Sequence, residues 1–137
     1  MVYLAARMII PNKLIKLDYN PTTDVLFIEW PNMHDYSLPE MKFLMEEIIA
    51  SVKHYDIKRI LADSRRSHIT LDHATYGQLI SNMALMLQTT RLQKFARLTT
   101  TELNRETIAS QAAALVKDSI QYQSFDDAAV AMAWLTS

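Results

Sequence analysis

The polar side chains that could do chemistry are concentrated between Lys58 and Gly77 of this 137-residue chain. In this window a short apolar segment, Ile60 to Ala62, runs into a polar loop, and the loop opens a long apolar helix. The candidate binding residues are Asp63, Ser64, Arg65, Arg66, His68, Asp72 and His73. Because loops held on a rigid α/β scaffold commonly carry binding residues, we predict a functional surface here.

Two adjacent arginines precede the predicted helix. Unpaired backbone N–H groups and the helix dipole favour an anion at a helix N-terminus, and Arg65 and Arg66 add two fixed positive charges. The pattern therefore predicts a site for a small anion such as a phosphate or a carboxylate. The alternative is that the arginines are solvated or pair with Asp63.

Histidines in two predicted loops define a second candidate, a metal site. In a parallel sheet the loops after neighbouring strands meet at one edge, so their side chains can converge on one ion. The residues considered are His34, Asp35, Asp63, His68, Asp72 and His73. No two histidines have the H-x-x-x-H spacing that places a pair on one helix face. We therefore expect no metal and no other cofactor.

Serines beside these histidines define a third candidate, hydrolysis. It would need Ser64 or Ser67 next to His68 or His73, with a carboxylate to orient the histidine. The chain has one glycine and no cysteine. Strained nucleophile turns, glycine-rich phosphate loops and thiolate nucleophiles are therefore excluded in their usual forms. We expect a protein that is not an enzyme, and a hydrolase is the minor alternative.

Charge and hydropathy narrow the class of partner. The chain has 14 Lys and Arg residues against 15 Asp and Glu residues, and the basic residues are scattered, so nucleic acid is not an expected partner. The apolar opening lacks a basic leader and is interrupted at Arg7, and no later apolar run approaches the length of a bilayer span. We expect one cytoplasmic domain covering residues 1–137, without a transmembrane segment.

The elements that position these residues follow from the spacing of apolar side chains. A polar turn between two β-branched and aromatic segments predicts an antiparallel hairpin, and residues 1–12 precede it as an N-terminal arm or edge strand. Strands that alternate with helices further on predict an α/β fold with a mainly parallel sheet and about four helices. The predicted strands are 14–19, 24–30, 60–62, 94–98 and 120–122, and the predicted helices are 38–54, 71–89, one beginning within 99–106 and one after Ser124.

Caps and inward faces are predicted for three of the helices. Ser37 and Glu40 have the spacing of a capping box, and Ser124 is the predicted cap of the last helix. The predicted inward residues are Leu103, Ile108, Ala112, Leu115 and Val116 in the third helix and Ala128, Ala131, Met132 and Leu135 in the last. Segment 60–62 is expected to be buried on both faces of the sheet.

Surplus apolar surface on the helix at 71–89 predicts an interface. Leu85 and Met86 extend its apolar stripe beyond what a single core needs, so we expect a homodimer. Several methionines lie on predicted helix faces, and methionine adapts to irregular cores and to varied ligands. Core packing is one interpretation of these methionines, and a pocket for an apolar ligand is the other.

Four segments together resemble the STAS-like, or SpoIIAA-like, family of small domains. They read VLFIEWP, RILADSRRSHIT, KFARL and FDDAAVAMAWL, within a resemblance that runs from about Leu14 to the end of the chain. The resemblance implies successive strand–helix units with an antiparallel first strand, and a fold related to that of certain lipid carriers. In phosphorylated members of that family, the helix after the third strand begins with Asp-Ser-Ser-Gly or Asp-Ser-Thr-Gly, and a hydroxyl of this motif accepts the phosphate. This chain reads Leu71-Asp72-His73-Ala74 there, so it has the aspartate but neither the phosphate-accepting hydroxyl nor the glycine.

Two hypotheses about function follow. The first is a non-enzymatic regulatory module that recognises a protein partner through the loop and helix start from Asp63 to His73. The second is a binder or carrier of a lipid or another apolar or amphiphilic ligand, able to associate with a membrane. A small anionic ligand is compatible with either.

Overall fold

The computed structural model describes residues 8–12, 14–33 and 36–137, which form six strands and four helices. The strands are β1 (Met8–Ile10), β2 (Lys16–Asn20), β3 (Val25–Glu29), β4 (Arg59–Asp63), β5 (Lys94–Leu98) and β6 (Gln121–Phe125). The helices are α1 (Leu38–His54), α2 (His73–Leu87), α3 (Leu103–Ala114) and α4 (Ala128–Leu135). The predicted α/β class and the four helices are confirmed.

The six strands form one mixed sheet whose spatial order follows the chain, from β1 to β6. β1 and β3 each run antiparallel to β2, whereas β4, β5 and β6 are each parallel to the strand before them. The hairpin and the parallel half of the sheet are therefore as predicted. β1 is an edge strand, as allowed for the N-terminal segment, while residues 1–7 of that segment lie outside the described residues.

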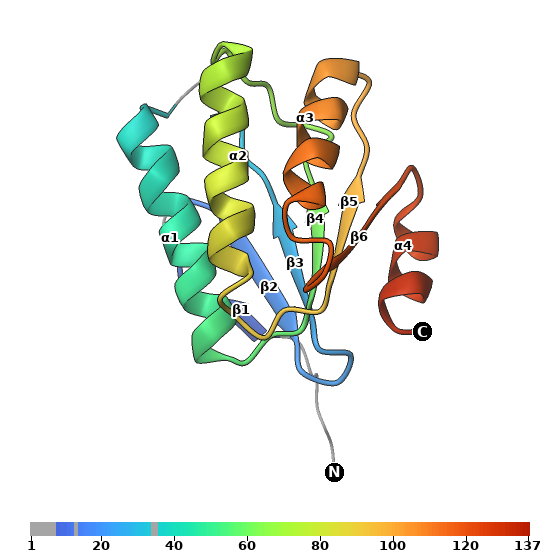
Figure 1. Ribbon diagram of the computed structural model, residues 1–137. Helices are drawn as coiled ribbons and strands as arrows, with labels where there is room; N and C mark the ends of the chain where they lie inside the picture. The colour runs from blue at the N-terminus through green and yellow to red at the C-terminus, as the bar shows by residue number, and fades with distance from the viewer. Residues whose placement is uncertain (1–7, 13, 34–35) are drawn as a thin grey trace.

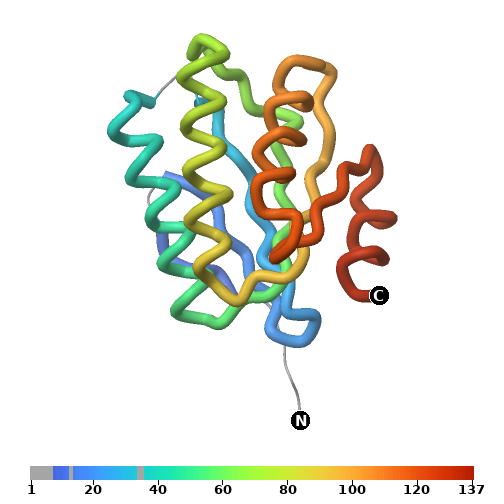
Figure 2. The backbone as a smooth tube through the Cα atoms, viewed as in Figure 1, coloured from blue at the N-terminus to red at the C-terminus, as the bar shows by residue number. Residues whose placement is uncertain are grey.

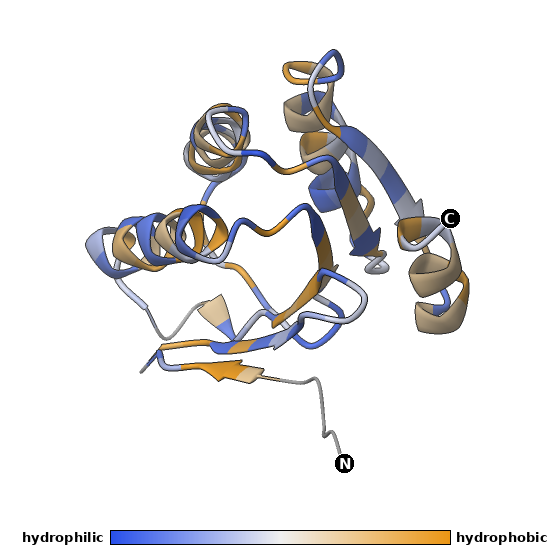
Figure 3. Ribbon diagram, turned by 90° about the horizontal axis from the view of Figure 1, so that it is seen from below, coloured by the Kyte–Doolittle hydropathy of each residue, from blue (hydrophilic) through white to orange (hydrophobic). Residues whose placement is uncertain are grey.

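Helices cover the sheet on both faces. Helices α1, α2 and α3 make the crossovers between parallel strands and lie side by side on one face (Figures 1 and 2). α4 packs against β4, β5 and β6 on the other face, and Figure 3 separates the two layers clearly. Among the described residues, none of the helices combines the length and the apolarity that a membrane crossing requires.

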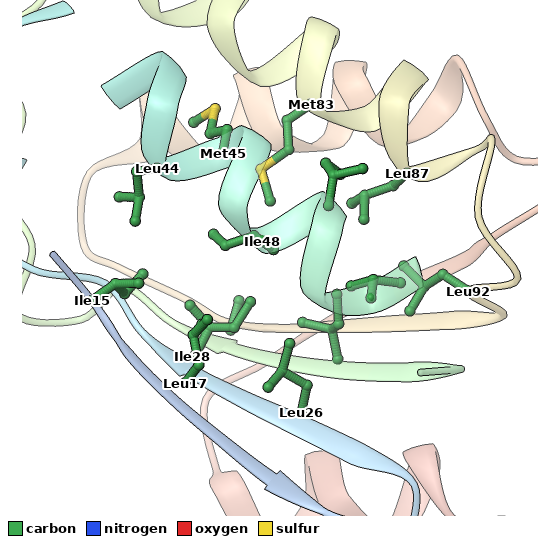
Figure 4. Close-up of a cluster of buried hydrophobic side chains, with 14 of the residues drawn as sticks. Ile15, Leu17, Leu26, Ile28, Leu44, Met45, Ile48, Met83, Leu87 and Leu92 are labelled. Carbon is green, nitrogen blue, oxygen red and sulfur yellow. The ribbon is translucent and has the colours of Figure 1, made fainter. Parts of the chain in front are cut away.

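Alternate strand residues supply two separate cores, because neighbouring side chains on a strand point to opposite faces. Ile60 and Ala62 pack toward α1 and α2, while Leu61 joins the smaller core under α4. All three are buried, which confirms that this strand is covered on both faces. In the larger core, most of the side chains labelled in Figure 4 come from β2 and β3 below and from α1 and α2 above, while Ile15 precedes β2 and Leu92 lies between α2 and β5.

The helix starts confirm one predicted cap and correct another. The Ser37 hydroxyl accepts from the Glu40 N–H at 3.3 Å, and the Glu40 carboxylate accepts from the Ser37 N–H at 2.9 Å, so the capping box is present. α4 is capped by Asp127, which accepts from two backbone N–H groups, and not by Ser124. The reason is that β6 continues to Phe125, which makes Ser124 a strand residue.

The inward face predicted for α3 is right in part. Ala112 and Val116 are buried as predicted, whereas Leu103 and Leu115 are 79% and 55% exposed. The buried stripe, at helical spacing, is completed by Arg105 and Ala109, which were not predicted to face inward. In α4, Ala131 and Leu135 are buried as predicted, but Ala128 is exposed. The phase of α3 matters because it turns a charged side chain into the interior.

Candidate functional site

The loop after β4 has an inner and an outer surface. Its first residues form a turn in which the Ser67 N–H donates to the Ser64 carbonyl at 3.1 Å. Ser64 and Ser67 are buried, whereas Arg65, Arg66 and His68 are exposed. The predicted candidate residues are therefore adjacent in the chain but are divided between two environments.

On the outer surface the two predicted arginines differ. Arg65 makes a two-pronged ion pair with Asp63, with Nε–Oδ1 at 3.0 Å and Nη2–Oδ2 at 2.9 Å. Burial raises the pKa of Asp63, but hydrogen bonds from Arg65 outweigh it and hold that pKa below its usual value. The Arg66 side chain is 87% exposed, and its closest acidic oxygen among the described residues belongs to Glu29 at 3.9 Å. Of these two arginines, Arg66 is the one that presents its positive charge to solvent without a close partner.

The N-terminus of α2 already carries an anionic group. The Asp72 carboxylate caps the helix by accepting from the Thr75 N–H at 2.8 Å and the Thr75 hydroxyl at 3.0 Å. These hydrogen bonds lower the pKa of Asp72, so it is ionised at neutral pH. A second anion at this terminus would meet that negative charge.

Among the residues that the structure describes, neither the predicted metal ligands nor the predicted hydrolase residues form a cluster. The described residues contain no group of three or more potential metal ligands, and the predicted ligands His34 and Asp35 lie outside them. His68 and His73 are exposed on the outer surface of the loop, while both serines are buried. A serine–histidine pair is therefore not formed between these four residues.

On the inner surface a cavity of about 90 Å³ lies between the sheet and α1, α2 and α3. Most of its wall is apolar, with aliphatic and aromatic side chains from the three helices and from β5 and β6. Four methionines take part, namely Met33, Met41, Met45 and Met83. Met45 and Met83 lie side by side between α1 and α2 (Figure 4). Because methionine has three flexible bonds, this wall can adapt to the shape of an occupant.

One end of the cavity is polar and incompletely paired. Ser64 Oγ, Ser67 Oγ and Arg105 Nε are buried and have no hydrogen-bond partner among the described residues. The Arg105 guanidinium is tied to the serine turn, because its Nη1 donates to the Ser67 carbonyl at 2.7 Å. A buried donor or acceptor left unpaired costs about 1–3 kcal/mol, so three such groups at one place need an explanation.

Arg97 on β5 also lines the cavity, but its charge is paired with that of Glu106. Its guanidinium donates to both carboxylate oxygens of Glu106, at 3.0 and 3.2 Å. Thr100 adds its N–H at 3.1 Å and its hydroxyl at 2.6 Å. Burial raises the pKa of Glu106, but the hydrogen bonds from Arg97 and Thr100 together with the Arg97 charge hold it below its usual value. This network accounts for the charge of Arg97 within the fold.

A surface pocket leads to the polar end of the cavity. It has a volume of about 540 Å³ and lies between the segment that enters α2 and the first turn of α3. Ile69, Leu71, Tyr76 and Arg105 line both this pocket and the cavity. These four side chains therefore form the partition between solvent and the interior.

Sequence reasoning missed Arg105, Arg97 and Tyr76 as candidate residues. A signal for Arg105 exists, because it shares a helical spacing with Ala109, Ala112 and Val116, and a charged residue on an apolar stripe is unusual. Ser67 was considered only as a nucleophile, whereas the structure makes it part of the cavity wall.

Of the two predicted interface residues on α2, one faces solvent and the other is turned toward the core. Leu85 is 48% exposed, and Met86 is partly buried against the larger core. The exposure of Leu85 leaves an apolar side chain available for contact with another molecule. The predicted homodimer itself stays a prediction.

Comparison with protein-family models, with curated proteins and with solved structures returns no match for this chain. The STAS-like family therefore remains a prediction made from the four segments that resemble it.

Proposed function

We propose that this protein binds a small apolar or amphiphilic ligand between its sheet and α1, α2 and α3. The observation that carries the proposal is the set of three buried polar atoms, Ser64 Oγ, Ser67 Oγ and Arg105 Nε, without partners in the described part of the chain at one end of an apolar cavity. Water can satisfy the polar groups, but an apolar cavity holds water poorly. A ligand with a polar head and an apolar body would pair the buried polar atoms and also fill the apolar part of the cavity.

Binding, not turnover, is the activity that the cavity supports. Its described lining has no histidine, aspartate, glutamate or cysteine to act as a general base or a nucleophile. Arg97 is held by Glu106, and Arg105 donates to the Ser67 carbonyl. We place the protein in the cytoplasm as a carrier or sensor of its ligand, with a STAS-like fold.

The methionines provide a direct test with butan-1-ol as the probe. In protein labelled with ¹³C at the methionine methyl groups, butan-1-ol should shift the signals of Met33, Met41, Met45 and Met83 in a saturable way. The signals of Met8 and Met132, which do not line the cavity, serve as internal references. Absence of saturable shifts in the four cavity signals would refute the proposal.

A cavity-filling variant sharpens this test. Ala112→Leu places additional carbons at a buried position of the cavity wall. We expect the affinity for butan-1-ol to fall by at least about tenfold, since each buried methylene of the ligand is worth about 0.8 kcal/mol. Ala50→Leu, at an exposed position of α1, is the matched control and should bind as the wild type does. Equal affinities for the two variants would place the ligand elsewhere.

A second candidate function uses the outer surface of the same loop, as a regulatory module for a protein partner. The observation that favours it is a hydrogen-bonded loop backbone that carries an exposed and weakly paired charge. The His68 N–H donates to Asn32 Oδ1 and the Met33 N–H to the His68 carbonyl, both at 3.0 Å, while Arg66 projects into solvent. In a pull-down, Arg66→Ala should lose a partner that Lys42→Ala, a change on the exposed face of α1, retains. Equal recovery by both variants would remove this candidate.

A further inference from the structure

We infer that the ligand is a short-chain carboxylic acid, with its carboxylate bound by Arg105 and by the hydroxyls of Ser64 and Ser67. This inference rests on the proposed function and adds the chemistry of the head group. Each of these residues is at least nine-tenths buried and lines the cavity. Each also carries a buried polar atom that no described residue pairs.

The charge of Arg105 requires an anion. Arg105 is 5% exposed, and the carboxylate nearest to it among the described residues is that of Glu102, at 3.6 Å. The Glu102 side chain is 46% exposed and makes no capping hydrogen bond to α3. An exposed partner at this distance compensates a buried cation poorly, because solvent screens the carboxylate more than the guanidinium. The interior therefore holds a positive charge that the cavity does not balance.

The donors favour a carboxylate over a neutral polar group. Arg105 Nε–H belongs to the planar fork that matches two carboxylate oxygens, and each serine hydroxyl can donate one further hydrogen bond. The turn that carries both serines is fixed to Arg105 through the Ser67 carbonyl. An amide or an alcohol would use some of these donors but would leave the charge of Arg105 unbalanced.

The position of Arg105 sets the orientation of the ligand. Arg105 lines both the cavity and the surface pocket, so a carboxylate bound there lies at the entrance. The chain of the acid then extends into the apolar interior toward Met45 and Met83. With this orientation the ligand enters chain first, and its carboxylate replaces that of Glu102 as the close partner of Arg105.

The volume of the cavity limits the length of the ligand. A cavity of about 90 Å³ is smaller than the engineered cavity of roughly 150 Å³ that accepts benzene, so only the short chain of an acid of about four carbons fits inside, with its carboxylate at the entrance beside Arg105. Longer chains require the four methionines to repack. Butanoate is therefore the probe of choice, with butanamide as its neutral counterpart of similar shape.

The test compares these probes at pH 7, where butanoate is ionised. Butanoate should bind the wild type at least about tenfold more tightly than butanamide, as followed by the methyl signals of the four cavity methionines. Inorganic phosphate at the same concentration should leave those signals in place, because it has no apolar chain. Butanamide binding as tightly as butanoate, or phosphate causing the same shifts, would overturn the inference.

Variants of the two charged residues locate the carboxylate. Arg105→Leu should reduce the ratio of butanoate affinity to butanamide affinity to about 1, and Arg105→Lys should give an intermediate ratio because it keeps the charge and loses the fork. Glu102→Gln should raise butanoate affinity severalfold by removing the competing carboxylate, whereas Glu46→Gln on the exposed face of α1 should not.

A preference for butanoate that persists in Arg105→Leu would move the head group to another site. If butan-1-ol fails to bind the wild type, the proposed function itself is wrong. If butan-1-ol binds and no carboxylate preference is seen, only the head-group assignment is wrong. Thermal unfolding of each variant confirms that the fold is retained.

Discussion

Arg97 and Arg105 line the same cavity and are buried to nearly the same degree, yet they differ in how well their guanidinium groups are paired. Arg97 donates to both carboxylate oxygens of Glu106, and the Thr100 hydroxyl donates to the same carboxylate. Arg105 donates to one backbone carbonyl and has a longer ion pair, at 3.6 Å, with the half-exposed Glu102. The comparison teaches that burial of a charge does not by itself mark a site. The incomplete pairing at Arg105 is what distinguishes a binding group from a structural one.

Breaking the complete network should have the largest effect. Glu106→Leu leaves Arg97 buried without its counter-charge, so we expect the free energy of unfolding in urea to fall by about 3–5 kcal/mol. Glu46→Leu, at an exposed position of α1, is the control and should change stability by no more than about 0.5 kcal/mol. A loss below about 1 kcal/mol for Glu106→Leu would show that the pair contributes little.

Removing one hydroxyl from each region should have a smaller and unequal effect. Thr100→Val deletes the 2.6 Å hydrogen bond to the Glu106 carboxylate and should cost about 1.5–3 kcal/mol. Ser64→Ala deletes a hydroxyl that has no partner within the described structure, and it should leave stability unchanged or slightly higher. Equal losses in the two variants, measured by urea unfolding, would mean that the Ser64 hydroxyl is paired in solution.

Of the two arginine regions, acid should weaken the one that contains Glu106. The folded-state pKa of Glu106 lies below its usual value, so its stabilisation is fully present above the unfolded-state pKa of about 4.3. That stabilisation is lost as the pH falls through the lower folded-state value. Glu106→Gln should therefore show a shallower decline of unfolding free energy below about pH 4.3 than the wild type. Arg105→Leu should keep the wild-type slope, and the reverse pattern would contradict the comparison.

Removing the incompletely paired arginine should change stability least. Arg105→Leu loses one hydrogen bond to the Ser67 carbonyl but also removes a buried charge that lacks a close counter-charge. These two effects oppose each other, so we expect unfolding free energy within about 1 kcal/mol of the wild-type value. A loss as large as that of Glu106→Leu would show that Arg105 is structural.

The fold was largely predictable because its signals are local. Strand β5 was predicted with the observed bounds, and the capping box at Ser37 marks the start of α1 correctly. The inward face of α3 was predicted only in part, because its alanine-rich stripe is only weakly more apolar than the opposite face and contains Arg105. Leu103 and Leu115 were predicted to face inward because leucine is strongly apolar, yet both face solvent.

The candidate site was predicted only in part. The loop was identified, but which of its side chains turn inward depends on the turn between Ser64 and Ser67, not on residue type. The contact between Arg105 and Ser67 joins residues 38 positions apart, so it follows from the tertiary arrangement of α3 against the β4 loop. No local pattern carries that information.

The strand order has a consequence for how the chain is made. Because β1 to β6 lie in the sheet in the order in which they are synthesised, no strand has to be inserted between two that are already paired. Each strand after β1 therefore leaves the ribosome when its neighbour is already available, which suits folding from the N-terminus during translation. A product that stops after α3 would lack both β6 and α4. It would expose the backbone of β5 as an open edge and uncover Leu61, Ala96 and Leu98, so such fragments should aggregate or be degraded.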